Sequence, residues 1–294
     1  RLANQGTRAF FGEHPYAWWP TGTRETIHAA TLDTVRAFHD QYYRPEHAHL
    51  VLAGPGDVDT VLAEVRERFG GWARGTTPLP VTPPLLDHTF PDRIALREDI
   101  PPVEVAAYVW VLPPPDHPDH MALEVAFEAL TGGEINHVRK LLVEDRPLAA
   151  EAMALHDTWR AGGLFGIGGA FIPYRSEKKQ FKLLDRTLGT LHELAWLGDD
   201  EVRQAKRRML RKAWSTRFYA SSVASDIGEA VASGGEPVDG LAKASRIEAV
   251  TPEQARAAWQ AWVQERQPVR GVVRPEKVPL GVRLFGWLYP LVAK

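Results

Sequence analysis

The spacing of apolar residues predicts the same helical element at two places in the chain. Ile27-His-Ala-Ala-Thr31 recurs as Ile247-Glu-Ala-Val-Thr251, and apolar residues at helical spacing follow each copy. Thr is favoured at a helix N-cap, and Pro252 suits the first helical position. The apolar positions are Leu32, Val35, Phe38 and Tyr42 in the first copy, and Ala255, Ala258, Trp259, Trp262 and Val263 in the second.

An apolar run follows each predicted helix. The first helix breaks near Pro45 and the second near Pro268. The runs that follow, Leu50–Ala53 and Val269–Val273, both predict buried strands. The shared order of helix start, proline break and strand favours a true internal repeat over a chance match.

Between the two copies, a linker and a long series of further elements are predicted. The stretch from Gly70 to Pro84 is rich in glycine and proline, which is typical of a linker. Most predicted strands come before most predicted helices along this part of the chain. This order predicts an α+β fold, with helices on one face of a mainly antiparallel sheet. The predicted strands are 93–98, 103–112, 149–156 and 164–171, and the predicted helices are 117–130, 139–145, 177–197, 199–217 and 221–232.

The repeat also predicts the domain boundaries. In the second unit roughly 160 residues precede the repeated element, whereas few residues precede Ile27 in the first. If the two units are homologous, the first lacks a front part of roughly 130 residues. We therefore expect residues 1–75 to be the C-terminal part of a first domain, 76–86 a linker, 87–275 a complete second domain and 276–294 a tail.

Composition narrows the possible chemistry. The 294 residues carry a net charge of -2, so no overall field attracts nucleic acid, and we interpret the basic stretch Arg203–Lys212 as a solvated helix face. The absence of cysteine excludes disulfides and thiolate metal ligands, and leaves the compartment open. No apolar run approaches the roughly 18 residues that a transmembrane helix needs. The tail segment Phe285–Val292 is apolar, and could dock on the body, on a partner or on a membrane surface.

Residues near the start of the chain carry a family resemblance. Phe11-Gly-Glu-His-Pro-Tyr16, Thr23-Arg-Glu25 and Tyr43-Arg-Pro45 follow one another in order, together with Gly22, Asp33 and the run His49–Gly54. This order resembles the peptidase M16 family, which includes insulinase and the mitochondrial processing peptidase. Ala17-Trp18 and Pro55-Gly56 depart from the family pattern.

The resemblance implies tandem α/β-roll domains, of which the first is incomplete here. It also implies a clamshell formed by pairs of such halves around an extended peptide. In active members, the first domain holds zinc through a His-x-x-Glu-His motif and a distal Glu, and the motif Glu activates the attacking water.

None of the 11 histidines of this chain lies in a His-x-x-Glu-His motif. Zinc is therefore expected for the family but not bound by this chain, and the chain alone is expected to be inactive. His120 and Glu124 are one helical turn apart and could seat a metal weakly, but we interpret them as a solvated first turn. No nucleophile elbow or phosphate-binding glycine loop is present.

The resemblance also implies a second-domain Arg and Tyr that contact the substrate in active members. The matching segment is Leu142–Ala150, with Val143 at the Arg position and Ala150 at the Tyr position. Neither side chain can donate a hydrogen bond. Gly132, Gly133, Arg139 and Arg146 are candidate substrate-facing residues, although we favour a solvated helix end for the two arginines.

These observations leave three functional hypotheses. The first is an M16-type peptidase chain or subunit that binds extended peptides and forms a homodimer or heterodimer with another M16 chain that brings zinc. The second is a non-catalytic structural subunit, as in the core proteins of the respiratory bc1 complex. The third is a stand-alone peptide-binding or chaperone-like module.

Overall fold

The computed structural model describes residues 2–75, 84–86, 89–99, 103–133, 136–145, 149–171 and 177–277. Most of the predicted linker 76–86 and nearly all of the tail 276–294 lie outside these ranges. The chain divides into two compact units. One contains residues 1–19, 84–211 and 245–294, and the other contains residues 20–83 and 212–244.

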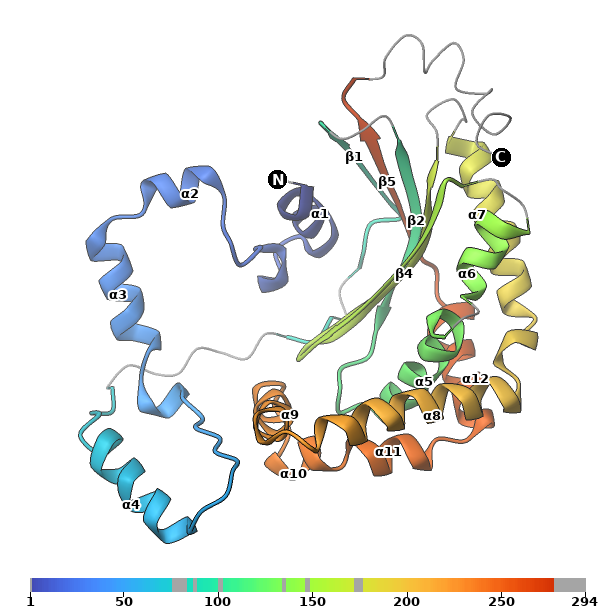
Figure 1. The fold of residues 1–294 in the computed structure, drawn as a ribbon. Helices are drawn as coiled ribbons and strands as arrows, with labels where there is room; N and C mark the ends of the chain where they lie inside the picture. Colours follow the sequence, from blue (N-terminus) through green and yellow to red (C-terminus); the bar gives the residue numbers. More distant parts are fainter. Residues whose placement is uncertain are drawn as a thin grey trace. The chain divides into compact units, whose positions relative to one another are not determined.

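The first unit is built around a five-stranded sheet (Figure 1). Its strands are β1 (Arg93–Glu98), β2 (Glu104–Leu112), β3 (Glu151–Trp159), β4 (Gly162–Phe171) and β5 (Val269–Pro275), in the order β1-β5-β2-β4-β3. Neighbouring strands are antiparallel except for the parallel pair β1–β5. The predicted α+β class and mainly antiparallel sheet are confirmed.

Helices cover one face of this sheet and enclose the main core. Alternate residues of β2 point to this face, because side chains alternate along a strand. Trp110 of β2 stacks on Phe165 with ring centroids 5.5 Å apart, and Phe165 meets Trp259 at 5.4 Å. The covering helices are α5 (His120–Thr131), α7 (Glu177–His192), α8 (Asp199–Thr216) and α12 (Pro252–Trp259).

The opposite face of the sheet carries a helix that the sequence did not predict. Helix α1 (Leu2–Phe11) and the 3-10 turn Pro15–Ala17 pack Phe10 and Phe11 in a second apolar cluster with Leu164 and Val269. The Tyr16 hydroxyl accepts a hydrogen bond from the Ala161 N–H at 3.0 Å. The main helical layer lies on one face as predicted, and α1 adds a helix on the other face.

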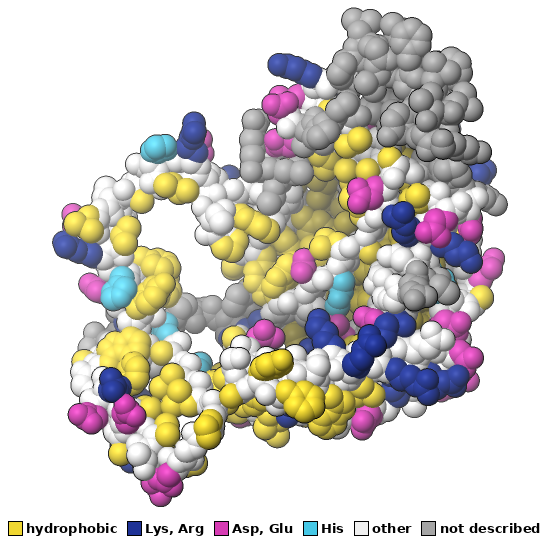
Figure 2. Space-filling view, viewed as in Figure 1, with side chains coloured by type: hydrophobic (Ala, Val, Ile, Leu, Met, Phe, Trp, Pro, Cys, Tyr) yellow, Lys and Arg dark blue, Asp and Glu magenta, His cyan; other side chains and the backbone are white. Residues whose placement is uncertain are grey.

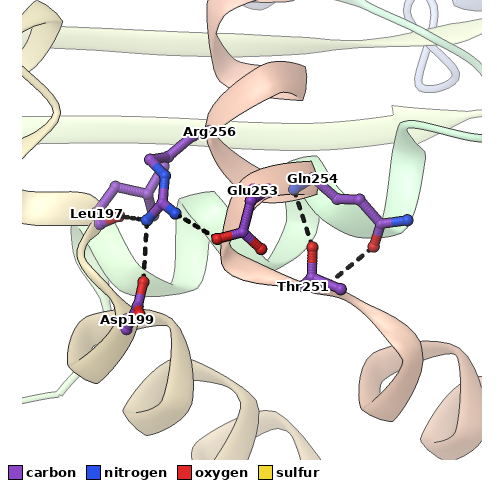
Figure 3. A network of polar contacts seen from close by, with 6 residues as sticks. All are labelled: Leu197, Asp199, Thr251, Glu253, Gln254 and Arg256. Carbon is purple, nitrogen blue, oxygen red and sulfur yellow. Dashed lines mark hydrogen bonds and ion pairs between the residues drawn. The ribbon is translucent and has the colours of Figure 1, made fainter.

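The repeated element is confirmed as two pairs of helices. In the first copy α2 (Arg24–Ala29) leads to α3 (Leu32–Tyr42), and in the second α11 (Lys243–Ala249) leads to α12. Thr31 and Thr251 are the N-caps of α3 and α12, and each forms a capping box. Figure 3 shows the Thr251 box beside Arg256, which bridges Asp199 and Glu253. A π-helical turn, Gln260–Gln264, extends α12.

The predicted strand at Leu50–Ala53 is wrong, whereas its counterpart forms β5. Residues 50–53 have no strand structure, and Leu50 and Leu52 are exposed. A strand forms only where a neighbour accepts and donates its backbone hydrogen bonds, and all five strands of the described residues lie in the sheet of the first unit. The remaining helices are α4 (Val58–Phe69), α6 (His137–Arg139), α9 (Ala220–Ala232) and α10 (Pro237–Leu241), with 3-10 turns at Pro45–His47 and Ala195–Leu197.

The two copies predict opposite responses to the same substitution. Ile247→Ala removes a fully buried side chain and should lower the free energy of unfolding by about 2–5 kcal/mol. Ile27→Ala alters a side chain that is 63% exposed, and should change that free energy by less than about 0.5 kcal/mol. Urea unfolding of the 294-residue chain measures both values. Equal losses for the two variants would contradict the burial difference.

Candidate functional site

The segment predicted to match the family Arg and Tyr positions includes a short helical turn beside β3. Asn136 is the N-cap of helix α6, and its Oδ1 accepts a hydrogen bond from the Arg139 N–H at 2.9 Å. A π-helical turn, Lys140–Glu144, follows directly. Val143 lies in this turn, half-buried, and packs against the main core. Its side chain thus supports the fold.

After this turn the chain returns to the sheet. The Ala149 N–H donates to the Leu142 carbonyl at 3.2 Å, and the Ala150 N–H donates to the Ala170 carbonyl at 2.8 Å. Ala150 is exposed just before β3 begins. This position could present a larger side chain to solvent, but alanine offers no hydrogen-bond donor there. Arg146 lies outside the described residues.

Arg139 is exposed at the end of α6. Its Nε donates to Glu144 Oε1 at 3.2 Å, and both side chains are more than half exposed. Exposed ion pairs of this kind contribute little to stability. The Arg139 guanidinium is paired with Glu144, five residues along the chain. A substrate-facing role for Arg139 stays a prediction.

Gly132 and Gly133 end helix α5. The Gly132 N–H donates to the Glu128 carbonyl at 2.9 Å, and a Cβ at Gly132 would lie 2.6 Å from that same oxygen. Gly133 has φ +79°, in the left-handed region that favours glycine. Both glycines are therefore required by the helix terminus itself.

Arg208 of α8 binds the C-terminal turn of α5. This contact was not predicted from the sequence. The Arg208 Nε donates to Glu128 Oε1 at 2.6 Å and its Nη2 to the Glu128 carbonyl at 2.8 Å. The interpretation of the basic stretch as a solvated face is therefore wrong at Arg208. It is also wrong at Lys206, whose Nζ caps the carbonyls of Glu248 and Val250 at 2.8 and 2.6 Å.

A charge cluster joins α5 to β3. The Nε2 atoms of His120 and His156 lie 3.5 and 3.3 Å from Glu124 Oε1. Burial lowers the pKa of His156 to about 4 and also lowers the pKa of His120. The interpretation of His120 and Glu124 as a solvated turn missed His156, because only strand pairing brings β3 beside α5.

The zinc of the family does not fit the described residues. Among them, no group of three or more His, Asp or Glu side chains is arranged to hold a metal ion. The two histidines of the α5–β3 cluster meet one carboxylate oxygen, and no further ligand completes a tetrahedral set. We interpret this cluster as a polar contact that joins helix α5 to strand β3.

The face of the sheet opposite α5 is open near strand β3. Met153 and Leu155 are 37% and 44% exposed there. Across the strand pair they lie opposite Gly168 and Gly166 of β4, so no large side chain flanks them on that side. Figure 2 shows hydrophobic side chains gathered over this part of the sheet. Because β3 ends the strand order, its outer edge has no strand partner among the described residues.

The mainly antiparallel five-stranded sheet, its covering helices and the repeated capped helix define an α+β domain. The chain belongs to the peptidase M16 family. Residues 29–209 match the family description "Peptidase M16 inactive domain".

Curated relatives carry zinc protease names. The chain is 26% identical over 280 residues to an uncharacterized zinc protease of Streptomyces coelicolor, a match that covers 93% of this chain and 60% of that protein. It is 29% identical over 176 residues to an uncharacterized zinc protease of Mycobacterium leprae, covering 59% of this chain and 39% of the relative. The matches thus span less than two thirds of each of these relatives.

Solved structures share the fold. A protease from Helicobacter pylori aligns with a TM-score of 0.79 at 18% identity, covering 94% of this chain and 66% of that one. A peptidase M16 inactive domain from Pseudomonas fluorescens aligns with a TM-score of 0.72 at 18% identity, covering 93% and 64%. A chain of complex III2 from Candida albicans aligns with a TM-score of 0.68 at 16% identity, covering 92% and 65%. In the part of this chain that the structure describes, no helix is long and apolar enough to cross a membrane.

The α5–β3 cluster predicts a loss of stability in acid. The pKa of His156 is about 4 in the folded chain and near 6.5 in the unfolded chain. The unfolded state therefore binds the proton first as the pH falls. The free energy of unfolding should therefore decrease between pH 6.5 and 4, by at most about 3 kcal/mol. Glu124 opposes this loss because its carboxylate favours the protonated ring.

Urea unfolding at several pH values measures this loss. His156→Gln removes this titrating group, so the free energy of unfolding should fall less steeply with pH below 6.5, while the lowered pKa of His120 still contributes. Identical slopes in the wild type and the variant would contradict the assignment.

Proposed function

We propose that this chain is the peptide-binding, non-catalytic part of an M16 zinc protease. In this proposal, hydrolysis of the peptide bond needs a zinc-bearing segment or partner chain. The chain contributes a surface on which an extended substrate lies. A shared fold does not establish function by itself, and the edge of the sheet is the feature that supports peptide binding.

The observation that carries the proposal is strand β3. An edge strand offers backbone N–H and C=O groups to an added strand, and side-chain contacts then supply selectivity. Here the edge is flanked by the exposed side chains of Met153 and Leu155, which can contact alternate side chains of a bound peptide. Glu151 and Asp157 are also exposed on β3, so the same strand offers negative charge to a basic peptide.

The sequence of this chain supports a non-catalytic role. No histidine has the zinc-motif spacing, and Val143 and Ala150 stand where active relatives of the family place Arg and Tyr. Val143 packs on the core, and Ala150 exposes only a methyl group.

Peptide binding at β3 predicts a specific mutational pattern. A fluorescently labelled, unstructured peptide of about 15 residues, rich in Leu, Val and Lys, should bind the chain and increase fluorescence anisotropy. Leu155→Asp should weaken binding at least about tenfold, because it places a charge in an apolar contact. Val238→Asp, at a residue 63% exposed outside the first unit, is the matched control and should leave binding unchanged. Equal binding by the wild type and Leu155→Asp would exclude the β3 site.

Catalysis by the isolated chain is predicted to be absent. Purified chain with added Zn²⁺ should not cleave the same peptide above the rate without protein, because its sequence has no His-x-x-Glu-His motif to hold zinc and activate water. Mass spectrometry of the peptide after incubation measures this. Cleavage that a chelator abolishes, in a preparation containing only the 32.8 kDa chain, would refute the non-catalytic assignment.

A structural subunit is the second candidate function. The fold shared with a chain of complex III2 and the substituted Arg and Tyr positions favour it. The peptide-binding experiment separates the two candidates. A structural subunit would show no saturable binding at β3.

A further inference from the structure

Strand β2 continues past the end of its pairing with β5. The pairing with β5 stops at Val109, opposite Val269, whereas the pairing with β4 continues to Leu112. Pro268 precedes β5 and has no backbone N–H with which to extend the ladder. Among the described residues, 110–112 therefore have a strand neighbour on one side only.

The space beside this end of β2 is a cavity of about 190 Å³, which we call the β2 cavity. Its apolar walls come from β2, from the segment before β1 and from the start of β5. They are formed by Leu86, Phe90, Val109, Trp110, Val111 and Val269. Pockets for drug-sized ligands measure roughly 300–1,000 Å³, so this cavity suits a group of the size of one amino-acid side chain.

Two polar residues of the turn before β5, Arg266 and Gln267, complete the lining. Both are exposed, so a ligand can reach them from solvent. The Arg266 guanidinium carbon lies 3.6 Å from the centroid of the Trp262 ring, and this stacking leaves the N–H groups at the guanidinium edge able to donate. The Arg266 carbonyl accepts a hydrogen bond from Trp110 Nε1 at 3.3 Å, which holds the turn beside the cavity.

Arg266 forms no ion pair in the part of the chain that the structure describes, and partial burial lowers the pKa of its guanidinium. Other arginines beside the core of this unit are paired, Arg208 with Glu128 and Arg256 with Asp199. A guanidinium beside apolar walls without a counter-ion favours an anionic ligand. Its parallel N–H groups match the two oxygens of a carboxylate.

We propose that the β2 cavity binds a small apolar carboxylate, with Arg266 and Gln267 donating to the carboxylate and the apolar walls enclosing the hydrocarbon body. Two sources present this chemistry, the C-terminal residue of a peptide that ends in leucine and a free branched-chain carboxylic acid. An anion without a hydrocarbon body, such as phosphate, gains only the contact with the polar rim. The cavity lies between β2 and the turn before β5, so the inference does not depend on peptide binding at β3.

A ligand pair that differs only in charge tests the free-acid source. Isocaproate and its amide, isocaproamide, have the same hydrocarbon body. Two-dimensional NMR of the 294-residue chain follows the Trp110 indole N–H, which is bonded to the Arg266 carbonyl. Isocaproate should shift this signal saturably at roughly millimolar concentration, and isocaproamide should bind at least about tenfold more weakly, because it lacks the charge.

A second ligand pair tests the peptide source. Gly-Ser-Gly-Ser-Leu with a free C-terminus should shift the same signal, whereas the same peptide with an amidated C-terminus should not. Tighter binding of the free-terminus peptide than of isocaproate would assign the cavity to peptide ends, and binding of isocaproate alone would assign it to free acids. Leu155→Asp, which disrupts the proposed β3 site, should leave all these shifts unchanged.

Substitutions separate the charge from the apolar walls. Arg266→Gln should weaken isocaproate binding at least about tenfold, and Arg266→Lys should bind with intermediate affinity, because lysine offers a single point charge. Val111→Phe fills the cavity and should weaken binding while Arg266 is intact. Arg207→Gln, at an exposed arginine of α8, is the matched control and should bind like the wild type. Circular dichroism and urea unfolding check that each variant is folded.

Four results would each overturn the proposal. They are the absence of saturable shifts with both isocaproate and the free-terminus peptide, equal binding of isocaproate and isocaproamide, isocaproate binding that Arg266→Gln leaves unchanged, and phosphate binding as tight as that of isocaproate. Because the fluorescence assay at β3 uses a different site and Leu155→Asp, failure of this proposal and failure of the proposed peptide-binding function are distinguishable.

Discussion

The insertion of strand β5 between β1 and β2 holds the first unit together. It brings the end of the chain into a sheet whose other strands come from residues 93–171. Helix α12, which leads into β5, closes the core through Trp259, and Arg256 on its outer side connects it to Leu197 and Asp199. Removing this helix and strand would open the sheet at its centre and expose the aromatic core.

The same element in the first copy has all its local signals but no sheet to enter. Its threonine cap, helix and apolar positions are present, yet Leu50–Ala53 remains without strand structure. Local sequence is sufficient for the helix because capping and periodicity act within a few residues. A strand depends on partners far away in sequence, so its formation is decided by what surrounds it.

This distinction explains what the sequence could predict. Strand β1 was predicted with its observed bounds, and helices α7, α8 and α9 were placed within about five residues, because their periodic patterns are long and clear. The short helices α10 and α11 were not predicted. Helix α1 was missed because Leu2–Phe11 has a central Gly6 and no capping signal, and its stability comes from contacts of Phe10 and Phe11 with the sheet. The positions of Val143 and Ala150 followed from the family resemblance, whereas Arg208 and His156 could be assigned only after distant segments were brought together.

The two copies of the repeated element differ because, among the described residues, only the second contributes a strand to a sheet. Amide hydrogen exchange on the 294-residue chain alone tests this difference directly, by comparing residues 49–55 with residues 269–275 in the same sample. Residues 269–275 should be strongly protected, and residues 49–55 should exchange at near-unfolded rates. Equal protection of the two segments would contradict it.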